Sequence, residues 1–174
     1  MNGEASGWRL ILTAMALLAC VAGVLAPGCV RGEVEGPPVM RPGRDACVAC
    51  GMLIHEDRCA AAWLIERDGV REHEMFDDLG CLLDHERLAV DPPRVVGRWA
   101  RDYERRGWVA CERAVYVFSD PDRLLTPMGS GIVAFEREED ARGVIERFGG
   151  EVMGFDRLVT ARREWMEARY GKPR

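Results

Sequence analysis

Cysteine content is the feature of this sequence that most limits the folds it can adopt. The chain of 174 residues contains seven cysteines, and Cys20 and Cys29 lie close to the N-terminus. The others are Cys47, Cys50, Cys59, Cys81 and Cys111. Because an odd number of cysteines cannot close completely into disulfides, at least one thiol must be free, lipid-linked, intermolecular or a metal ligand. The apolar content of 48% allows an ordinary packed core to stabilise the chain instead.

Residues 1–29 are predicted to be a signal peptide or lipoprotein anchor region. Leu10–Ala26 is an uncharged apolar run that follows Arg9, as in a secretory signal. Its 17 residues also reach the lower limit for a membrane-spanning anchor. Both Cys20 and Cys29 follow a small residue, as lipidated cysteines do. We favour Cys29 as the lipidation site, because a polar segment rich in proline and glycine begins directly after it.

Residues 30–44 have the composition of a flexible tether. A cleaved signal, an uncleaved anchor and a lipid anchor all place the following residues outside the cytoplasm, in the periplasm or at the cell surface. About 130 residues remain, which is enough for one ordinary domain or two very small ones. The net charge is −5 and the basic residues form no stripe, which argues against a nucleic-acid partner.

The first half of the remaining chain is predicted to contain two strands, a helix and a third strand. The strands are expected at Ala60–Ile65, Val70–Phe76 and Val95–Tyr103, with the helix between Asp77-Asp78 and Asp91. Asp68-Gly69 separates the first two strands and is a hairpin signal. Acidic residues at the start of a helix accept hydrogen bonds from its free N–H groups and complement its dipole.

The second half repeats this order of elements. Strands are expected at Ala114–Phe118, Ile132–Phe135 and Val152–Phe155, and helices at Glu138–Phe148 and Asp156–Tyr170. We therefore predict an α+β fold of two small strand-strand-helix-strand units, residues 45–112 and 113–174. The sheet should be mostly antiparallel, and a C-terminal helix completes the second unit.

Cys47-Val-Ala-Cys50 is the first chemical signal. Two thiols at this spacing can face one point, and thiolates are soft ligands that select Cu(I), zinc or iron–sulfur centres. The second such pair that a structural zinc site normally needs does not occur in the sequence. A structural disulfide between Cys47 and Cys50 is an equal alternative at this point. A redox role is weakened, because a segment rich in proline and glycine stands where a thioredoxin-like strand would be expected.

Two methionines favour copper. Met52 follows Cys50-Gly51 directly, and a thioether is a ligand for Cu(I) but not for zinc. Met128 lies in Thr126–Gly131, where proline and glycine hold it on a stiff loop. Either methionine could instead be a packing residue.

The remaining candidates are weaker. His55 follows the cysteine motif and is a further metal candidate, whereas His73 and His85 have less support. Cys59 and Cys111 fall in or near strands and are expected in the core. Cys81, on the predicted helix, is expected either in the core or paired with another thiol.

Together these motifs resemble the NosL family, the copper-binding lipoproteins accessory to nitrous oxide reductase. The matching segments are Asp45–Ile54, Asp68-Gly69 leading to Met75–Gly80, Trp108-Val109 through Ala114–Val117, Pro127–Phe135 and Gly149-Gly150. They run in order over most of the chain after the leader. The Cys-Gly-Met motif combined with the later Met-Gly loop is more specific than either motif alone.

The resemblance implies a Cu(I) chaperone that delivers copper to nitrous oxide reductase outside the cytoplasm. It also implies two strand-strand-helix-strand units, in agreement with the order expected above. Its Cu(I) ligands would be Cys50, or Cys47, and Met128, with Met52 and a nitrogen ligand as further members of the set.

The sequence thus predicts a membrane-anchored, non-enzymatic Cu(I) metallochaperone. No G-x-S-x-G, Walker A or H-E-x-x-H motif occurs, and the adjacent Asp77 and Asp78 diverge on a helix instead of forming a catalytic pair. Two alternatives remain open. One is an extracytoplasmic thiol–disulfide protein that uses Cys47 and Cys50. The other is a metal-binding module for another client, with ions such as Hg(II) or Zn(II).

Overall fold

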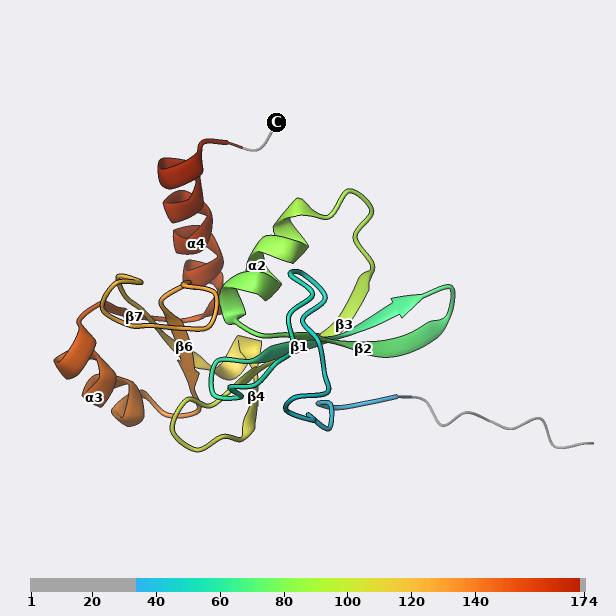
Figure 1. Ribbon diagram of the computed structural model, residues 1–174, viewed down its shortest axis with the longest axis horizontal. Coiled ribbons are helices and arrows are strands. Elements are labelled where there is room, and N and C mark those ends of the chain that lie inside the picture. Colours follow the sequence, from blue (N-terminus) through green and yellow to red (C-terminus); the bar gives the residue numbers. More distant parts are fainter. Residues whose placement is uncertain (1–33, 173–174) are drawn as a thin grey trace, which may run out of the picture. The chain divides into compact units, whose positions relative to one another are not determined.

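Strand β1 (Ala61–Arg67) lies inside a four-stranded antiparallel sheet with the strand order β2-β1-β3-β4 (Figure 1). This computed structural model describes residues 34–172, which belong to one compact unit. On either side of β1 lie β2 (Val70–Phe76) and β3 (Arg94–Arg101). The first five residues of β1 are all buried, because both faces of the strand are covered. That burial explains why its sequence is a continuous apolar run.

A two-residue turn joins β1 to β2. Arg67 pairs with Val70, and the turn residues Asp68 and Gly69 have φ angles of 52° and 75°. Positive φ at both positions gives the turn a twist that matches the flanking strands. The hairpin predicted from Asp68-Gly69 is therefore confirmed.

Helix α2 (Leu79–Leu88) follows β2 after two residues. Asp78 is its N-cap, and Oδ1 of Asp78 accepts a hydrogen bond of 2.7 Å from the backbone N–H of Gly80. Leu79 and Leu82 are buried in the core cluster that contains most of the first sheet. The helix start predicted at Asp77-Asp78 is thus confirmed, with Asp78 as the capping residue.

The second sheet has three antiparallel strands in the order β6-β5-β7. Its central strand is β5 (Val115–Phe118), between β6 (Ile132–Phe135) and β7 (Glu151–Met153). Helix α3 (Glu138–Phe148) connects β6 to β7, and helix α4 (Phe155–Tyr170) follows β7.

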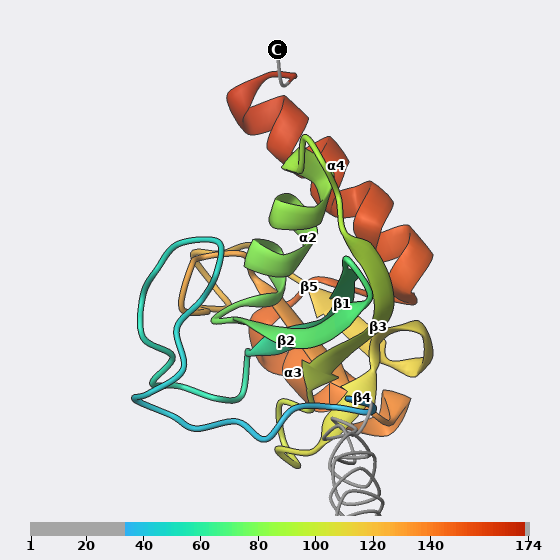
Figure 2. The same cartoon turned by 90° about the vertical axis from the view of Figure 1, so that its right-hand side faces the viewer.

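Helices α4 and α2 lie side by side in both views (Figures 1 and 2), and an ion pair of 2.8 Å joins Arg162 of α4 to Asp84 of α2. The two sheets also share one hydrophobic core. A single cluster of buried residues contains Trp63 and Phe76 from the first sheet and Tyr116 from the second. Residues 34–172 therefore belong to one compact unit that contains both sheets.

The α+β class is confirmed, but the first half has one strand more than predicted. The short edge strand β4 (Trp108–Ala110) pairs with β3, and a 3-10 turn, η1 (Cys111–Arg113), follows it. Three residues are too few to show an alternating pattern in the sequence. The third strand, predicted to reach Tyr103, ends at Arg101 because Asp102 accepts two hydrogen bonds from the backbone of the next turn.

Part of the predicted tether lies against the body of the protein. Pro38 is buried, Met40 packs on the core, and the carbonyl oxygen of Gly36 lies 2.7 Å from Nε2 of His73. The composition of residues 34–44, which predicted a flexible tether, does not reveal these contacts.

The predicted leader, with Cys20 and Cys29, and tether residues 30–33 lie outside the described residues. Within residues 34–172, no helix has the length and apolar character needed to cross a membrane.

The connection between β5 and β6 offers a test of the fold at two glycines. Gly129 and Gly131 have φ angles of 65° and 67°, but only at Gly131 would an added Cβ lie 2.3 Å from the carbonyl oxygen of Ser119. We expect Gly129→Ala to lower the free energy of unfolding by about 1–2 kcal/mol, the penalty for a left-handed backbone. Gly131→Ala should cost clearly more, because the backbone must also move. Urea denaturation measures both losses, and equal values would contradict the close approach at Gly131.

Candidate metal centre

The cysteine motif lies in a narrow loop that its own backbone closes. Ala46 and Leu53 form an antiparallel bridge, and the N–H of Cys47 donates to the carbonyl oxygen of Met52 at 2.9 Å. The N–H of Gly51 donates back to the carbonyl oxygen of Cys47 at 2.7 Å. Gly51 has a φ of 76°, which glycine adopts without strain. The loop therefore holds its two cysteines in a fixed relation.

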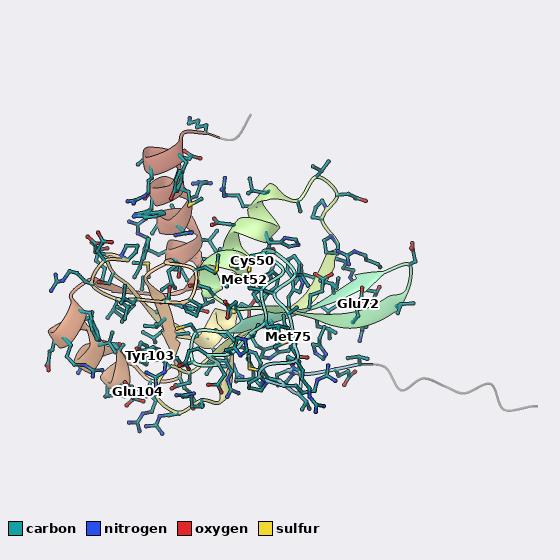
Figure 3. The ribbon with its side chains drawn as sticks, viewed as in Figure 1. Cys50, Met52, Glu72, Met75, Tyr103 and Glu104 are labelled. Carbon is teal, nitrogen blue, oxygen red and sulfur yellow. The ribbon has the colours of Figure 1, made fainter. Side chains whose placement is uncertain are left out.

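The loop is also attached to the first sheet. Cys47 forms a parallel bridge with Met75 near the end of β2, and the N–H of Val48 donates to the carbonyl oxygen of Met75 at 3.0 Å. As a result Cys47 is fully buried, whereas Cys50 is exposed. Figure 3 shows Cys50 and Met52 close together on this loop.

A third thiol comes from helix α2. Cys81 lies in the first turn of the helix, and its N–H donates to the carbonyl oxygen of Asp78 at 3.0 Å. The Sγ atoms of Cys47, Cys50 and Cys81 all lie within 4.8 Å of one another. These three residues form a group that could hold a metal ion, and thiolates prefer soft ions.

The three thiols differ in acidity. The pKa of Cys47 is lowered to about 5, because the thiol of Cys81 donates a hydrogen bond to its sulfur and the backbone N–H of Asp77 adds another, against the opposing effect of burial. The same contact with Cys47 raises the pKa of Cys81. Burial raises the pKa of Cys50. Burial and the negative charge of Cys47 raise the pKa of Asp77 to about 6. Of the three thiols, only that of Cys47 therefore has a lowered pKa.

A loop from the other half of the chain, Thr126–Gly131, packs against the start of α2 and is called the Met128 loop here. Oδ2 of Asp78 accepts a hydrogen bond of 2.6 Å from Oγ1 of Thr126 and one of 3.1 Å from the N–H of Met128. Oγ1 of Thr126 in turn accepts from the N–H of Ser130 at 2.9 Å. The contact is tight, since a Cβ placed on Gly80 would lie 2.5 Å from Cβ of Ser130. The start of α2 and the Met128 loop are thus packed against each other.

The loop, the helix and the Met128 loop surround one pocket of about 380 Å³. Its lining includes Cys50, Cys81, His85 and Met128. His85 lies one turn after Cys81 on α2, and its ring packs 5.5 Å from that of Trp63. The pocket therefore brings two thiols, a thioether and an imidazole to one opening.

A search against protein families matches residues 38–162 to the NosL family. The chain belongs to the NosL family. The resemblance to this family that the sequence motifs indicated is therefore confirmed.

Solved structures show the same fold. The crystal structure of the copper chaperone NosL from Shewanella denitrificans superimposes with a TM-score of 0.60 at 20% identity, over 74% of this chain and 99% of that one. At this identity the likeness concerns the fold. The search of curated proteins found no match.

The structure brings some of the predicted site residues together and leaves others apart. Cys50 and Met128 line the pocket, and Cys47 belongs to the group of three thiols that includes Cys50. Met52 is 53% exposed and does not line the pocket, and the exposed His55 does not line it either.

Sequence reasoning missed the place of Cys81 and His85 in this candidate site. The signal available was the capping aspartate: a cysteine three residues after Asp78 must lie in the first turn of α2. What the sequence did not show is that this turn faces the cysteine loop. The expected core cysteines, Cys59 and Cys111, are confirmed, and burial raises the pKa of each to about 12.

The acidity of Cys47 can be tested by titrating the reduced, metal-free protein and following the ultraviolet absorbance of thiolate. We expect one thiol to ionise with a midpoint near pH 5 and to be missing in Cys47→Ser. Cys81→Ala should raise that midpoint toward the ordinary thiol value, because the hydrogen-bond donor is lost. Cys81→Ser should restore part of the shift, since a hydroxyl can donate. A midpoint that is the same in all Cys81 variants would rule out this contact as the cause.

Proposed function

We propose that this protein is a carrier of Cu(I), which it binds as cargo between the cysteine loop and Met128. The observation that carries the proposal is that sulfur-bearing residues of two separate segments meet at one pocket: Cys50 and Met128 line it, and the Sγ atom of Cys47 lies within 4.8 Å of that of Cys50. The NosL structure from Shewanella denitrificans is that of a copper chaperone, which supports the same role here.

The donor set favours Cu(I) over harder ions. Thiolates and thioethers are soft, and the thioether of Met128 separates copper from zinc, which prefers thiolate and imidazole. We propose Cys47, Cys50 and Met128 as the ligands. Met52 is exposed beside the pocket, so its role is less direct than its place in the sequence motif indicated.

Charge limits how many thiolates bind the ion. Cu(I) with two thiolates carries a net charge of −1, and a third thiolate would make it −2. Asp77 and Asp78 are both buried beside the group, and burying further negative charge next to them is unfavourable. Cys81 therefore keeps its proton and donates to the sulfur of Cys47, where it holds the thiolate in place.

Exposure sets the order of transfer. Cys47 is buried and Cys50 is exposed, so an acceptor can approach Cys50 first. Cu(I) forms low-coordinate complexes, and an incoming thiolate or thioether can add to the ion before Cys50 leaves. This ligand exchange needs no change in the oxidation state of copper, so the protein acts as a carrier and not as an enzyme.

The acidities argue against a thiol–disulfide protein. An exchange thiol must be exposed and have a lowered pKa, because thiolate is the attacking form. Here the thiol with the lowered pKa is the buried Cys47, and the exposed Cys50 has a raised pKa. The two requirements fall on different residues. Insulin reduction at a rate typical of an oxidoreductase would revive the redox alternative.

The ligand set is tested by competition of the reduced protein against a Cu(I) chelator. We expect one Cu(I) per chain. Cys50→Ser and Met128→Leu should each weaken the affinity for Cu(I) by more than about 10–100-fold, which is the loss that removal of an outer-shell contact causes. Met52→Leu is the matched control, since it removes an exposed thioether from the neighbouring loop and should retain most of the affinity. If Cys50→Ser and Met128→Leu hold copper as tightly as the parent, the ligand assignment is wrong. A preference for Zn(II) over Cu(I) would move the protein to another class of carrier.

We further propose that the acceptor of the copper is nitrous oxide reductase. The carrier would meet it outside the cytoplasm, held at the membrane by a lipid anchor on Cys29, or on Cys20. The family assignment and the sequence of the leader support this placement. Mass spectrometry of the mature N-terminus identifies the lipidated residue.

The acceptor is tested with metal-free nitrous oxide reductase and the Cu(I)-loaded protein. We expect the loaded parent to restore reductase activity faster than the same amount of Cu(I) held by a chelator of equal affinity. The loaded Met52→Leu variant should match the parent. Equal rates for the protein and the chelator would show that the copper passes through solution and that this enzyme is not a specific acceptor.

A further inference from the structure

The proposed copper site leaves one thiol without a bond to the ion. The Sγ atom of Cys81 lies within 4.8 Å of those of Cys47 and Cys50. Cys47 and Cys50 come from a loop closed by backbone hydrogen bonds, and Cys81 comes from the first turn of a helix. Three thiols held around one point on ordered backbone form a tripod of donors.

We propose that Cys47, Cys50 and Cys81 together capture trivalent arsenic, supplied as arsenous acid. The reaction is As(OH)₃ + 3 RSH → As(SR)₃ + 3 H₂O. Three As–O bonds and three S–H bonds break, and three As–S bonds and three O–H bonds form. Arsenic stays in the +3 state, so no oxidant or reductant takes part. Where Cys47 starts as a thiolate, solvent supplies the proton for the third water.

Charge explains why a trivalent centre can use all three sulfurs. The product As(SR)₃ is neutral, whereas Cu(I) bound to the same three thiolates would carry −2. The buried carboxyl groups of Asp77 and Asp78 lie beside the group, and a buried negative charge without a partner is costly. A neutral complex avoids that cost.

Access also fits a small neutral acid. Cys50 is exposed, and both Cys50 and Cys81 line the pocket of about 380 Å³, which is much larger than arsenous acid. Cys47 lies behind them, fully buried. We expect the first As–S bond to form at the exposed Cys50 and the later bonds to draw the arsenic toward Cys81 and the buried Cys47.

Two arsenic compounds separate a three-thiol site from a simple pair. Arsenite offers three exchangeable oxygens, and phenylarsine oxide can bond to only two thiols. In the reduced, metal-free full chain, Cys81→Ala should weaken arsenite binding by about 100-fold or more, because the third bond forms within one molecule. The affinity for phenylarsine oxide should change little. Cys111→Ala is the matched control, since it removes a buried thiol outside the group and should leave both affinities unchanged. Cys20 and Cys29 are present in every variant and contribute equally.

Intact mass supplies a second readout. The arsenite adduct of the parent should have lost all three oxygens, and that of Cys81→Ala should retain one hydroxyl on arsenic. An unchanged arsenite affinity in Cys81→Ala, or a hydroxyl retained in the parent adduct, would overturn the proposal. The inference does not rest on copper transport, and a Cu(I) titration of the same preparations keeps the two apart. A parent that binds Cu(I) but not arsenite refutes only the arsenic site, and the converse refutes only the copper proposal.

Discussion

The fully buried carboxylate of Asp78 is the interaction on which the rest of the site depends. One of its oxygens caps α2 and so fixes the helical turn that carries Cys81. Its other oxygen accepts from Thr126 and Met128, which lie 48 and 50 residues later in the chain. A single side chain thus joins the helical turn that carries Cys81 to the backbone of Met128. An N-cap alone typically contributes about 0.5–2 kcal/mol, and here the same residue also determines the geometry of the donors.

The site combines soft donors with a negative surrounding, and this combination governs what it can hold. The carboxyl groups of Asp77 and Asp78 are buried, and burial together with the negative charge of Cys47 raises the pKa of Asp77 to about 6. A hydrogen bond from Cys81 then stabilises the thiolate of Cys47 without adding charge. In such a site a monovalent ion binds few thiolates, and a centre of higher valence binds more. Selectivity arises from electrostatics as well as from the softness of sulfur.

Much of the fold could be predicted from the sequence because its signals are local. Asp68-Gly69 fixes a turn, and Asp78 fixes a helix start, each within a few residues. The edge strand β4 was missed because three residues carry no periodicity. For the site, the sequence motifs supplied Cys47, Cys50 and Met128, but the position of Cys81 depends on how α2 lies against the loop. That arrangement arises from contacts between distant segments, such as the bond from Thr126 to Asp78, and no local pattern encodes it.

The missing side chain of Gly80 offers a way to alter the metal preference of this protein. This glycine carries no donor atom, yet the absent methyl group is what lets α2 lie directly against Ser130. A larger residue there would push α2 and Ser130 apart without replacing any of the proposed donor residues. The affinity for a metal ion could then be adjusted in small steps through the volume of the side chain at position 80.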